Sequence, residues 1–556
     1  MKKIISALLC VLIILTSVAF TASAAENELR VIVANDLHLS AKAYTAFNGN
    51  TTANPWAHVP SSGQLILESN AIITAFLEKE AKSDADIVII PGDLADSGLI
   101  SEHELMAAKF AEFEKESGKQ VYVVAGNHDY QKTTVAEFKS IYADFGYNEA
   151  IANDTATSSY VADLKDGYRL LAIDCNDPVT GLPAVDAELI EWVKAQLNTA
   201  KADGKKVIAM MHHNLLEHFI FGSAIHGSAL VKDESLKTIL ADAGVKFIFT
   251  GHTHDQDIAS FKSANGNVIY DVVTNSINGY PCQYRMVTFG KDVKFEEKRI
   301  DKVDTSLFPA GLSEEAMTLA ETNFTEYTKK VMWTGLRTTF TSYLNAASFI
   351  KLLKLDEATN PDMCRIIKSL GNKLSEVASM PFYTSDKNGN SLKDVAAKYG
   401  KTLPASNYTD LIDLAITLYQ AHCTGDENFA ANSTEVQLLT NAVSTVLCYC
   451  LEDLSAEDYT TVLKFALTLT GNTVPDNIIG FAGSSIKRIE GIDLVVSIVL
   501  RPLVIQFTTD ESPADNNVTL TGYRELSGWE KFVQLLREFA EKVKAFFQKI
   551  FGFLPA

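Results

Sequence analysis

Short apolar runs that end in polar residues recur through the first half of this chain. Runs of this length rich in β-branched residues are typical of buried strands, and the segments between them have apolar residues at helical spacing. The strand candidates cover residues 29–35, 86–90, 121–125, 168–174, 206–211, 245–250, 268–273 and 284–296. The helix candidates cover residues 65–81, 101–116, 186–202 and 230–243. Because buried strands that alternate with helices form mostly parallel sheets, the pattern predicts a layered α/β domain.

Five of these strand candidates are followed by side chains that can bind a metal ion. The five stretches are Asp36-Leu37-His38, Gly92-Asp93-Leu94-Ala95-Asp96, Gly126-Asn127-His128-Asp129, His212-His213 and Gly251-His252-Thr253-His254. In an open parallel sheet the carboxyl ends of the strands share one edge, and ligands bind there. One such stretch would be an ordinary loop, but five at strand ends predict a common site.

The chemistry of this residue set favours transition metals. Carboxylate oxygens, an amide oxygen and imidazole nitrogens suit Mn, Fe, Zn or Ni. The stretches offer more ligands than one ion takes, so we expect two divalent or trivalent ions that share a carboxylate, with Mn, Fe and Zn favoured. Paired ions about 3.5–4 Å apart are a common arrangement for the cleavage of phosphate esters.

The five stretches resemble the motif set of the calcineurin-like metallophosphoesterases, which is D-x-H, G-D-x-x-D, G-N-H-D/E, H and G-H-x-H in this order. The resemblance covers residues 29–300 and implies a four-layer αββα core. It implies a first metal bound by Asp36, His38 and His254, a second bound by Asn127, His212 and His252, and Asp93 as the bridge. His212 is preferred to His213 because the family places its ligand first in an H-x-P stretch, although Asn214 replaces the proline here.

The resemblance also implies in-line attack on phosphorus by a hydroxide that bridges the two ions. His128 would stabilise the transition state and protonate the leaving oxygen, and Asp96 would orient the His128 ring. Protein serine/threonine phosphatases of the superfamily carry D-R-G and N-H-E, whereas Asp96 is followed by Ser97 and His128 by Asp129. The motifs are more similar to those of class III cyclic-nucleotide phosphodiesterases and their exported relatives with a helical C-terminal domain.

The expected function is therefore hydrolysis of a small phosphodiester, with a cyclic nucleotide as one candidate. Phosphomonoesterase or nucleotidase activity, and cleavage of phospholipid or wall-polymer diesters, are alternatives because they use the same metal site. A non-catalytic surface-binding protein is a weaker alternative. Candidates for substrate contact, each of which is otherwise an ordinary loop residue, are Trp56, His58, His218, His226, Tyr280 and Arg285. His103 and His422 are expected to be structural.

The N-terminus indicates export. Lys2 and Lys3 precede an apolar run over residues 4–20 and an Ala-x-Ala sequence, which predicts a signal peptide at residues 1–24. An uncleaved anchor is the alternative, but the run is shorter than the roughly 20 residues of a membrane span. Six cysteines follow the predicted signal peptide, and the sequence allows them to be either disulfide-bonded or buried free thiols. The formal net charge of −20 repels polyanions and argues against a nucleic-acid partner.

The remaining sequence divides the chain into further parts. We expect a phosphoesterase domain at 25–304, an α-helical domain at 305–507 and a linker at 508–528, where polar residues and proline are frequent. The pattern of residues 529–556 predicts a basic, aromatic amphipathic helix that either lies on a membrane surface or docks on the helical domain. The sequence leaves the oligomeric state open.

Overall fold

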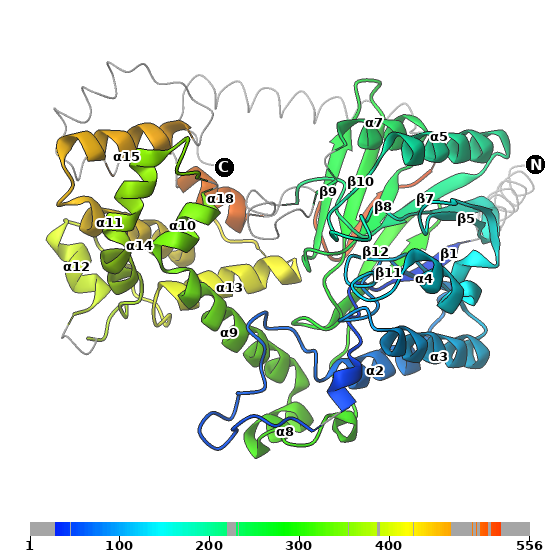
Figure 1. The fold of residues 1–556 in the computed structure, drawn as a ribbon, viewed down its shortest axis with the longest axis horizontal. Helices are drawn as coiled ribbons and strands as arrows, with labels where there is room; N and C mark the ends of the chain where they lie inside the picture. The colour runs from blue at the N-terminus through cyan, green and yellow to red at the C-terminus, as the bar shows by residue number, and fades with distance from the viewer. Residues whose placement is uncertain are drawn as a thin grey trace, which may run out of the picture.

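The computed structural model of this chain places two β-sheets face to face, with helices outside them and a helical region to one side (Figure 1). It describes residues 28–218, 230–468, 501–509 and 513–523, apart from residues 45, 232, 354, 386–389 and 426, together with the single residues 492 and 496.

The first sheet has six strands in the order β13-β12-β11-β1-β2-β3. Its strands are β1 (Leu29–Val33), β2 (Ile87–Ile90), β3 (Gln120–Val123), β11 (Gln283–Phe289), β12 (Asp292–Arg299) and β13 (Val518–Thr521). β1, β2 and β3 are parallel, and β11 pairs antiparallel with β1. Helices α2 (Ser69–Ala81) and α3 (Ile100–Ser117) lie on the outer side of this sheet (Figure 1). β2 is buried at every position because both of its faces are covered.

The second sheet has seven strands in the order β4-β5-β6-β7-β8-β10-β9. Its strands are β4 (Ala150–Asn153), β5 (Tyr160–Asp163), β6 (Tyr168–Ile173), β7 (Lys206–Met211), β8 (Phe247–Thr250), β9 (Asp257–Lys262) and β10 (Val268–Val273). β6, β7, β8 and β10 are parallel to their neighbours in this series. Helices α5 (Ala187–Ala202) and α7 (Glu234–Asp242) cover its outer side (Figure 1).

This arrangement confirms the predicted αββα sandwich. Aromatic rings from both sheets pack in its middle, where Phe289 of β11 lies 5.5 Å from Tyr168 and 6.0 Å from Phe247 between ring centroids. The sequence prediction missed β4 and β5, which have four residues each, and β9, in which only the first two of six positions are buried. It also treated residues 284–296 as one strand, but the chain reverses at Gly290 to form the β11–β12 hairpin.

The helical part predicted after residue 305 is also present. Its helices are α8 (Glu314–Thr322), α9 (Phe324–Tyr343), α10 (Ala346–Leu352), α11 (Pro361–Ala378), α12 (Leu392–Lys398), α13 (Leu411–Thr424), α14 (Thr434–Leu451), α15 (Ala456–Thr468) and α18 (Arg501–Thr508). α9 and α10 are separate helices, because the Asn345 side chain accepts from Ser348 N and caps a new helix.

Helices α8, α9 and α13 contact the sandwich. α8 and α9 pack on the segment before α2: Trp56 Nε1 donates to Glu315 Oε1 of α8 at 2.9 Å, and His58 Nε2 lies 3.2 Å from Tyr327 Oη of α9. The C-terminal end of α13 packs behind the G-H-x-H loop, where His422 Nε2 lies 3.3 Å from Asp255 Oδ1. Trp56 and His58 are buried in this contact, so the proposal that they reach substrate is wrong, and His422 is structural as predicted.

The contact between α9 and the sandwich contains a carboxyl group in an unfavourable environment. The Tyr327 hydroxyl donates to Glu68 Oε1. Glu68 is buried, and this burial raises the pKa of its carboxyl to about 7. The structure therefore favours the protonated form of Glu68 below about pH 7.

Replacing Glu68 with glutamine should stabilise the protein at pH 8.5 and have little effect near pH 4. The carboxyl titrates near 4.5 when unfolded and near 7 when buried, so its contribution to stability is fully present below pH 4.5 and is lost as the pH rises through 7. The total loss is about 3 kcal/mol. Urea unfolding of wild type and Glu68→Gln at both pH values measures it, with the exposed Glu326→Gln as the matched control. An equal difference between the two proteins at both pH values would contradict this prediction.

The C-terminal segment differs from the prediction. Residues 508–528 were expected to be a linker, but Val518–Thr521 forms the edge strand β13 and pairs antiparallel with β12. Arg285 Nη1 donates to Asp515 O, and the Tyr523 hydroxyl donates to Val207 O in the second sheet. Segment 513–523 therefore contacts both sheets. Its polar composition concealed the strand, because an edge strand does not need two apolar faces.

Several predictions lie outside the described residues: the signal peptide at 1–24, the helix at 529–556 and His226. Among the residues that the structure describes, none of the helices combines the length and apolar character of a membrane span. Six cysteines are buried, and none of them forms a disulfide within the described residues: Cys175, Cys282, Cys364, Cys423, Cys448 and Cys450.

Candidate metal centre

The loops that follow the strands have a strained backbone at the predicted ligands. Within the described residues, seven non-glycine positions have a positive φ angle. Five of the seven are predicted metal ligands: Asp36 (51°), His38 (40°), Asp93 (51°), His252 (70°) and His254 (58°). Each such residue costs on the order of 1–3 kcal/mol, and strain of this kind gathers at functional sites.

Hydrogen bonds fix these loops against one another. His38 N donates to Asp93 O at 2.9 Å, which continues the pairing of β1 and β2 beyond the strands. The Asp129 carboxylate accepts from Gly126 N at 2.8 Å and from Ala95 N at 3.0 Å, so it ties two motif loops together. His103 Nε2 lies 3.1 Å from Asp129 O and is buried, as expected of a structural histidine.

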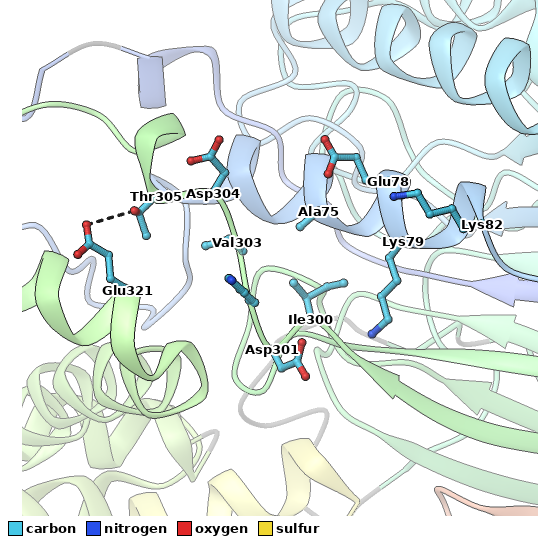
Figure 2. A pocket seen from close by; sticks show the side chains of 11 residues that line it. Ala75, Glu78, Lys79, Lys82, Ile300, Asp301, Val303, Asp304, Thr305 and Glu321 are labelled. Atoms are coloured by element: carbon cyan, nitrogen blue, oxygen red, sulfur yellow. Dashed lines mark hydrogen bonds between the residues drawn. The ribbon is translucent and has the colours of Figure 1, made fainter.

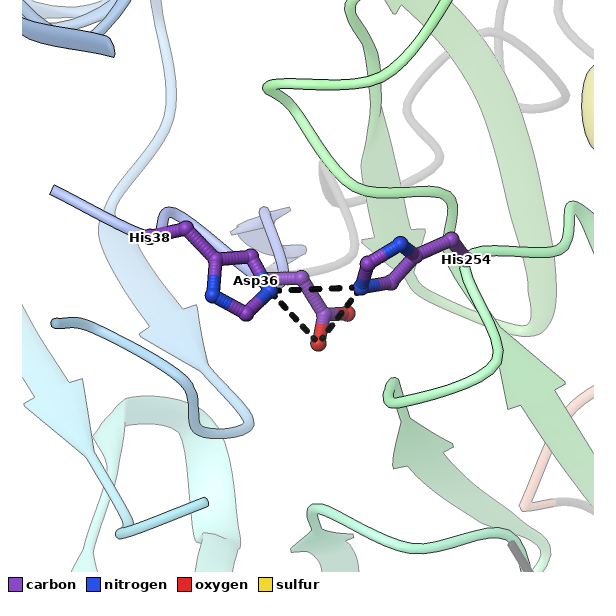
Figure 3. A group of neighbouring side chains, drawn as sticks. All are labelled: Asp36, His38 and His254. Atoms are coloured by element: carbon purple, nitrogen blue, oxygen red, sulfur yellow. Dashed lines mark hydrogen bonds and ion pairs between the residues drawn. The ribbon is translucent and has the colours of Figure 1, made fainter. Parts of the chain in front are cut away.

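The first group of predicted ligands is Asp36, His38 and His254 (Figure 3). His38 Nε2 lies 3.3 Å from His254 Nε2 and 4.0 Å from Asp36 Oδ1, and His254 Nε2 lies 3.5 Å from the same oxygen. Burial, with the neighbouring His128, holds the pKa of His38 well below its usual range. The ring is therefore neutral, and neutral imidazole is the form that binds metal.

The second group is Asn127, His212 and His252. Asn127 Oδ1 lies 2.9 Å from His212 Nε2 and 2.8 Å from His252 Nδ1, and the two nitrogens are 3.2 Å apart. His212 Nδ1 lies 3.0 Å from Pro91 O, which directs Nε2 into the site. A metal-binding histidine is commonly oriented by such a bond from its other nitrogen.

Asp93 lies between the two groups. Its Oδ2 is 3.3 Å from His212 Nε2 and 3.7 Å from His38 Nε2. Burial opposes ionisation, but the imidazoles of His212 and His128 hold the pKa of Asp93 well below its usual range. Gly126 makes this position possible, because a Cβ there would collide with Asp93 Oδ1. An ionised carboxylate within reach of both groups has the position expected of a bridge.

The structure also distinguishes the two adjacent histidines. The His213 ring lies 4.4 Å from the His252 ring between centroids, but its Nδ1 lies 3.6 Å from the Cys175 Sγ, and burial lowers its pKa to about 3. Asn214, which replaces the expected proline, donates to Thr250 Oγ1 at 3.0 Å and to Gly251 O at 3.2 Å. His212, and not His213, belongs to one of the groups of side chains that lie close enough to hold an ion, and Asn214 supports the neighbouring loop.

The group that orients the His128 ring differs from the one that the family resemblance implies. Its Nδ1 lies 2.6 Å from the backbone oxygen of Asp96, so the main-chain carbonyl, rather than the Asp96 carboxylate, orients the ring. Burial lowers the pKa of His128, but Asp93 and the Asp96 carbonyl outweigh it and raise the pKa above its ordinary value. His128 also lies close enough to His38 and Asp93 to complete a ligand group, so distances alone do not separate it from the ligands.

Other residues predicted to contact substrate have structural partners. His218 Nε2 lies 3.2 Å from Asp271 Oδ2, and Arg285 is fully buried and donates to Val273 O at 3.0 Å. Tyr280 packs against the apolar cluster that joins α9 and α13. The proposal of substrate contact is therefore wrong for His218 and Arg285, and Tyr280 is part of a contact between the two regions.

One residue near the centre was missed by sequence reasoning. The Gln64 amide nitrogen lies 3.1 Å from His254 Nδ1. Gln64 belongs to an irregular segment with no metal-binding motif, so nothing in the sequence distinguished it.

A surface pocket of about 580 Å³ lies elsewhere, between α2 and residues 300–305 (Figure 2). Both lysine and acidic side chains line this pocket, among them Lys79, Lys82, Glu78 and Asp301. None of the predicted metal ligands lines it. It does not form part of the metal centre.

Comparison with known proteins agrees with this geometry. The sequence model described as calcineurin-like phosphoesterase matches residues 29–256. These residues form a calcineurin-like phosphoesterase domain. The assignment supports the predicted enzyme class, a metal-dependent phosphoester hydrolase.

The calcineurin-like domain has phosphodiesterase relatives. A probable glycerophosphodiester phosphodiesterase of Arcobacter nitrofigilis is 28% identical over 161 residues, which are 28% of this chain and 54% of the relative. A probable cyclic nucleotide phosphodiesterase of Fibrobacter succinogenes is 24% identical over 203 residues, 36% of this chain and 70% of the relative. The chain thus spans about half of the first relative. A dimetal phosphatase structure from Danio rerio has a TM-score of 0.35 and 11% identity, covering 48% of this chain and 95% of that one.

The residues of the calcineurin-like domain fit the metal ions that the family implies. Imidazole nitrogens that face one another at 3.2–3.3 Å repel unless a proton or a cation lies between them. Both pairs have carboxylate or amide oxygens beside them, and this donor set suits Mn, Fe or Zn.

Proposed function

We propose that the protein hydrolyses a small phosphodiester at a dinuclear metal centre. The observation that carries the proposal is Asp93, whose Oδ2 lies within 3.7 Å of a nitrogen from each ligand group. Two cation sites that share one carboxylate match the arrangement used for phosphate-ester cleavage. When bound, the ions would lower the pKa of water and neutralise charge on the phosphoryl oxygens.

Different side chains would bind the two ions and donate the proton. Asp36, His38 and His254 would hold one ion, and Asn127, His212 and His252 the other. His128 donates through Nδ1 to the Asp96 carbonyl, which leaves Nε2 to face the reacting group. The raised pKa favours the protonated form of His128, which can give a proton to the leaving alcohol oxygen.

Both relatives described above are named as phosphodiesterases, which supports a diester over a monoester. We therefore expect metal-reconstituted protein to hydrolyse bis-aryl phosphate at least about tenfold faster than mono-aryl phosphate, in kcat/KM. The same assay with 3′,5′- and 2′,3′-cyclic nucleotides and a glycerophosphodiester identifies the alcohol. A preference for mono-aryl phosphate would favour the nucleotidase alternative, and inactivity on all of them would remove the enzyme proposal.

We also propose that the protein is exported and that its C-terminal helix contacts a membrane surface. The support is the leader pattern of residues 1–24 and the basic, aromatic character of residues 529–556. N-terminal sequencing of secreted protein, with Ala25 expected first, tests export. Vesicle co-sedimentation with and without residues 529–556 tests the contact, and equal pelleting would remove it.

A further inference from the structure

The two ring nitrogens of His254 face different surroundings. Nε2 points to Asp36 and His38 in the first ligand group, at 3.5 Å and 3.3 Å (Figure 3). Nδ1 points the other way and lies 3.1 Å from the side-chain amide of Gln64. Gln64 is half-buried and comes from the irregular segment before α2, far from every motif in the sequence.

The chemistry of a metal-bound imidazole specifies what Gln64 must do. A histidine that binds metal through Nε2 carries its proton on Nδ1, and that proton needs an acceptor. The amide of glutamine presents either its oxygen or its nitrogen after a half-turn about its last bond, and the Nδ1–H tautomer selects the oxygen. The bond would fix the tautomer and the direction of the His254 ring at the same time.

The backbone on both sides of Gln64 is anchored, so the amide has a fixed origin. Gly63 adopts a φ of 73°, which favours glycine. It packs so closely on α9 that a Cβ at this position would lie 2.9 Å from Met332 O. On the other side, Leu65 is fully buried, and its N–H donates to Asn278 O at 2.7 Å.

The loop at Asn278, which accepts the hydrogen bond from Leu65 N, is also hydrogen-bonded to the D-x-H loop. Ser276 Oγ donates to Asp36 O at 2.8 Å, and Asn278 Nδ2 donates to Leu37 O. The segment that carries Gln64 is thus fixed to the helical region through Gly63 and to the D-x-H loop through Leu65.

We propose that Gln64 is a positioning residue that orients His254 for metal binding in the first ligand group. The inference rests on the proposed function, because it requires His254 to be a ligand. It assigns to the segment before α2 a role in the metal centre, and it makes α9 one of the supports of that segment.

Three variants of the full chain test this role. Gln64→Met has similar length but no acceptor for Nδ1–H, Gln64→Glu restores an acceptor, and Gln196→Met on α5 is the matched control. The readout is stepwise binding of Mn²⁺ to metal-free protein, followed by electron paramagnetic resonance of free Mn²⁺. Loss of a bond of this kind commonly weakens metal affinity about 10–100-fold.

We expect Gln64→Met to weaken one of the two binding steps about 10–100-fold and leave the other unchanged, while Gln64→Glu and Gln196→Met behave as wild type. Wild-type affinity at both steps in Gln64→Met would overturn the proposal. Equal weakening in Gln64→Glu would also overturn it, because packing rather than the acceptor would then be the cause. If wild type binds no more than one ion, the proposed dinuclear centre fails instead, and the two failures are distinguishable.

Discussion

Asp93→Asn should abolish most hydrolysis and reduce bound metal from two ions to one or fewer per chain. The asparagine oxygen can still accept from His128 N, which donates to Asp93 Oδ1 at 2.8 Å, so the loop should keep its shape. A neutral amide cannot supply the negative charge shared between two cations. We expect kcat/KM to fall at least about 10³-fold, equivalent to about 4 kcal/mol of lost transition-state stabilisation.

Metal analysis by mass spectrometry and steady-state hydrolysis of the best diester measure this effect. Asp166→Asn is the matched control, because Asp166 also has a positive φ of 57° but lies between β5 and β6, away from the ligand groups. The control should retain both metal and activity. Two ions per chain and wild-type turnover in Asp93→Asn would show that Asp93 is not the bridge.

His128→Ala should lower kcat about 10²–10⁴-fold and leave two metal ions bound. The ring is the proposed proton donor, and the two ligand groups are complete without it. Because the leaving alcohol must be protonated, the loss should be smaller for a substrate whose alcohol is acidic, such as p-nitrophenol, than for an alkyl ester. A variant that also loses an ion would instead identify His128 as a ligand, since His128 lies near His38 and Asp93.

The companion variant Asp96→Asn should cost less than about tenfold in kcat, because it keeps the backbone carbonyl that holds His128 Nδ1 at 2.6 Å. The carboxylate role implied by the family resemblance predicts a loss close to that of His128→Ala. Comparison of the two variants on one substrate therefore separates orientation by the main chain from orientation by the side chain.

The parts of the fold that the sequence predicted are those with a strong local pattern. β2 and residues 207–211 of β7 are continuous apolar runs, and α5 begins where the Asp186 side chain accepts from Leu189 N. β4 has alternating half-buried and exposed positions over only four residues, which leaves little pattern to detect. Edge strands of this kind are specified by their neighbours rather than by their own composition.

The residues of the candidate site also fall into those that a local pattern predicted and those that it did not. The motif residues could be predicted because each follows a strand, and parallel strands bring their ends together. Polarity alone misled the interpretation of His58, His218 and Arg285, because the sequence does not show their buried partners Tyr327, Asp271 and Val273. Gln64 could not be predicted, since its position depends on a long-range contact with α9.

The pairing of β13 with β12 has a consequence for how the chain is made. Residues 304 and 518 flank the whole helical region, yet β12, which ends at Arg299, and β13, which begins at Val518, are neighbours in one sheet. A ribosome must therefore synthesise the whole helical region before the first sheet acquires strand β13. A fragment that ends near residue 304 would expose the backbone of β12 as an open edge, and open edges recruit strands from other molecules. Expression of the isolated first domain should accordingly give aggregates, whereas a version with residues 513–523 joined after residue 304 by a flexible linker should remain monomeric.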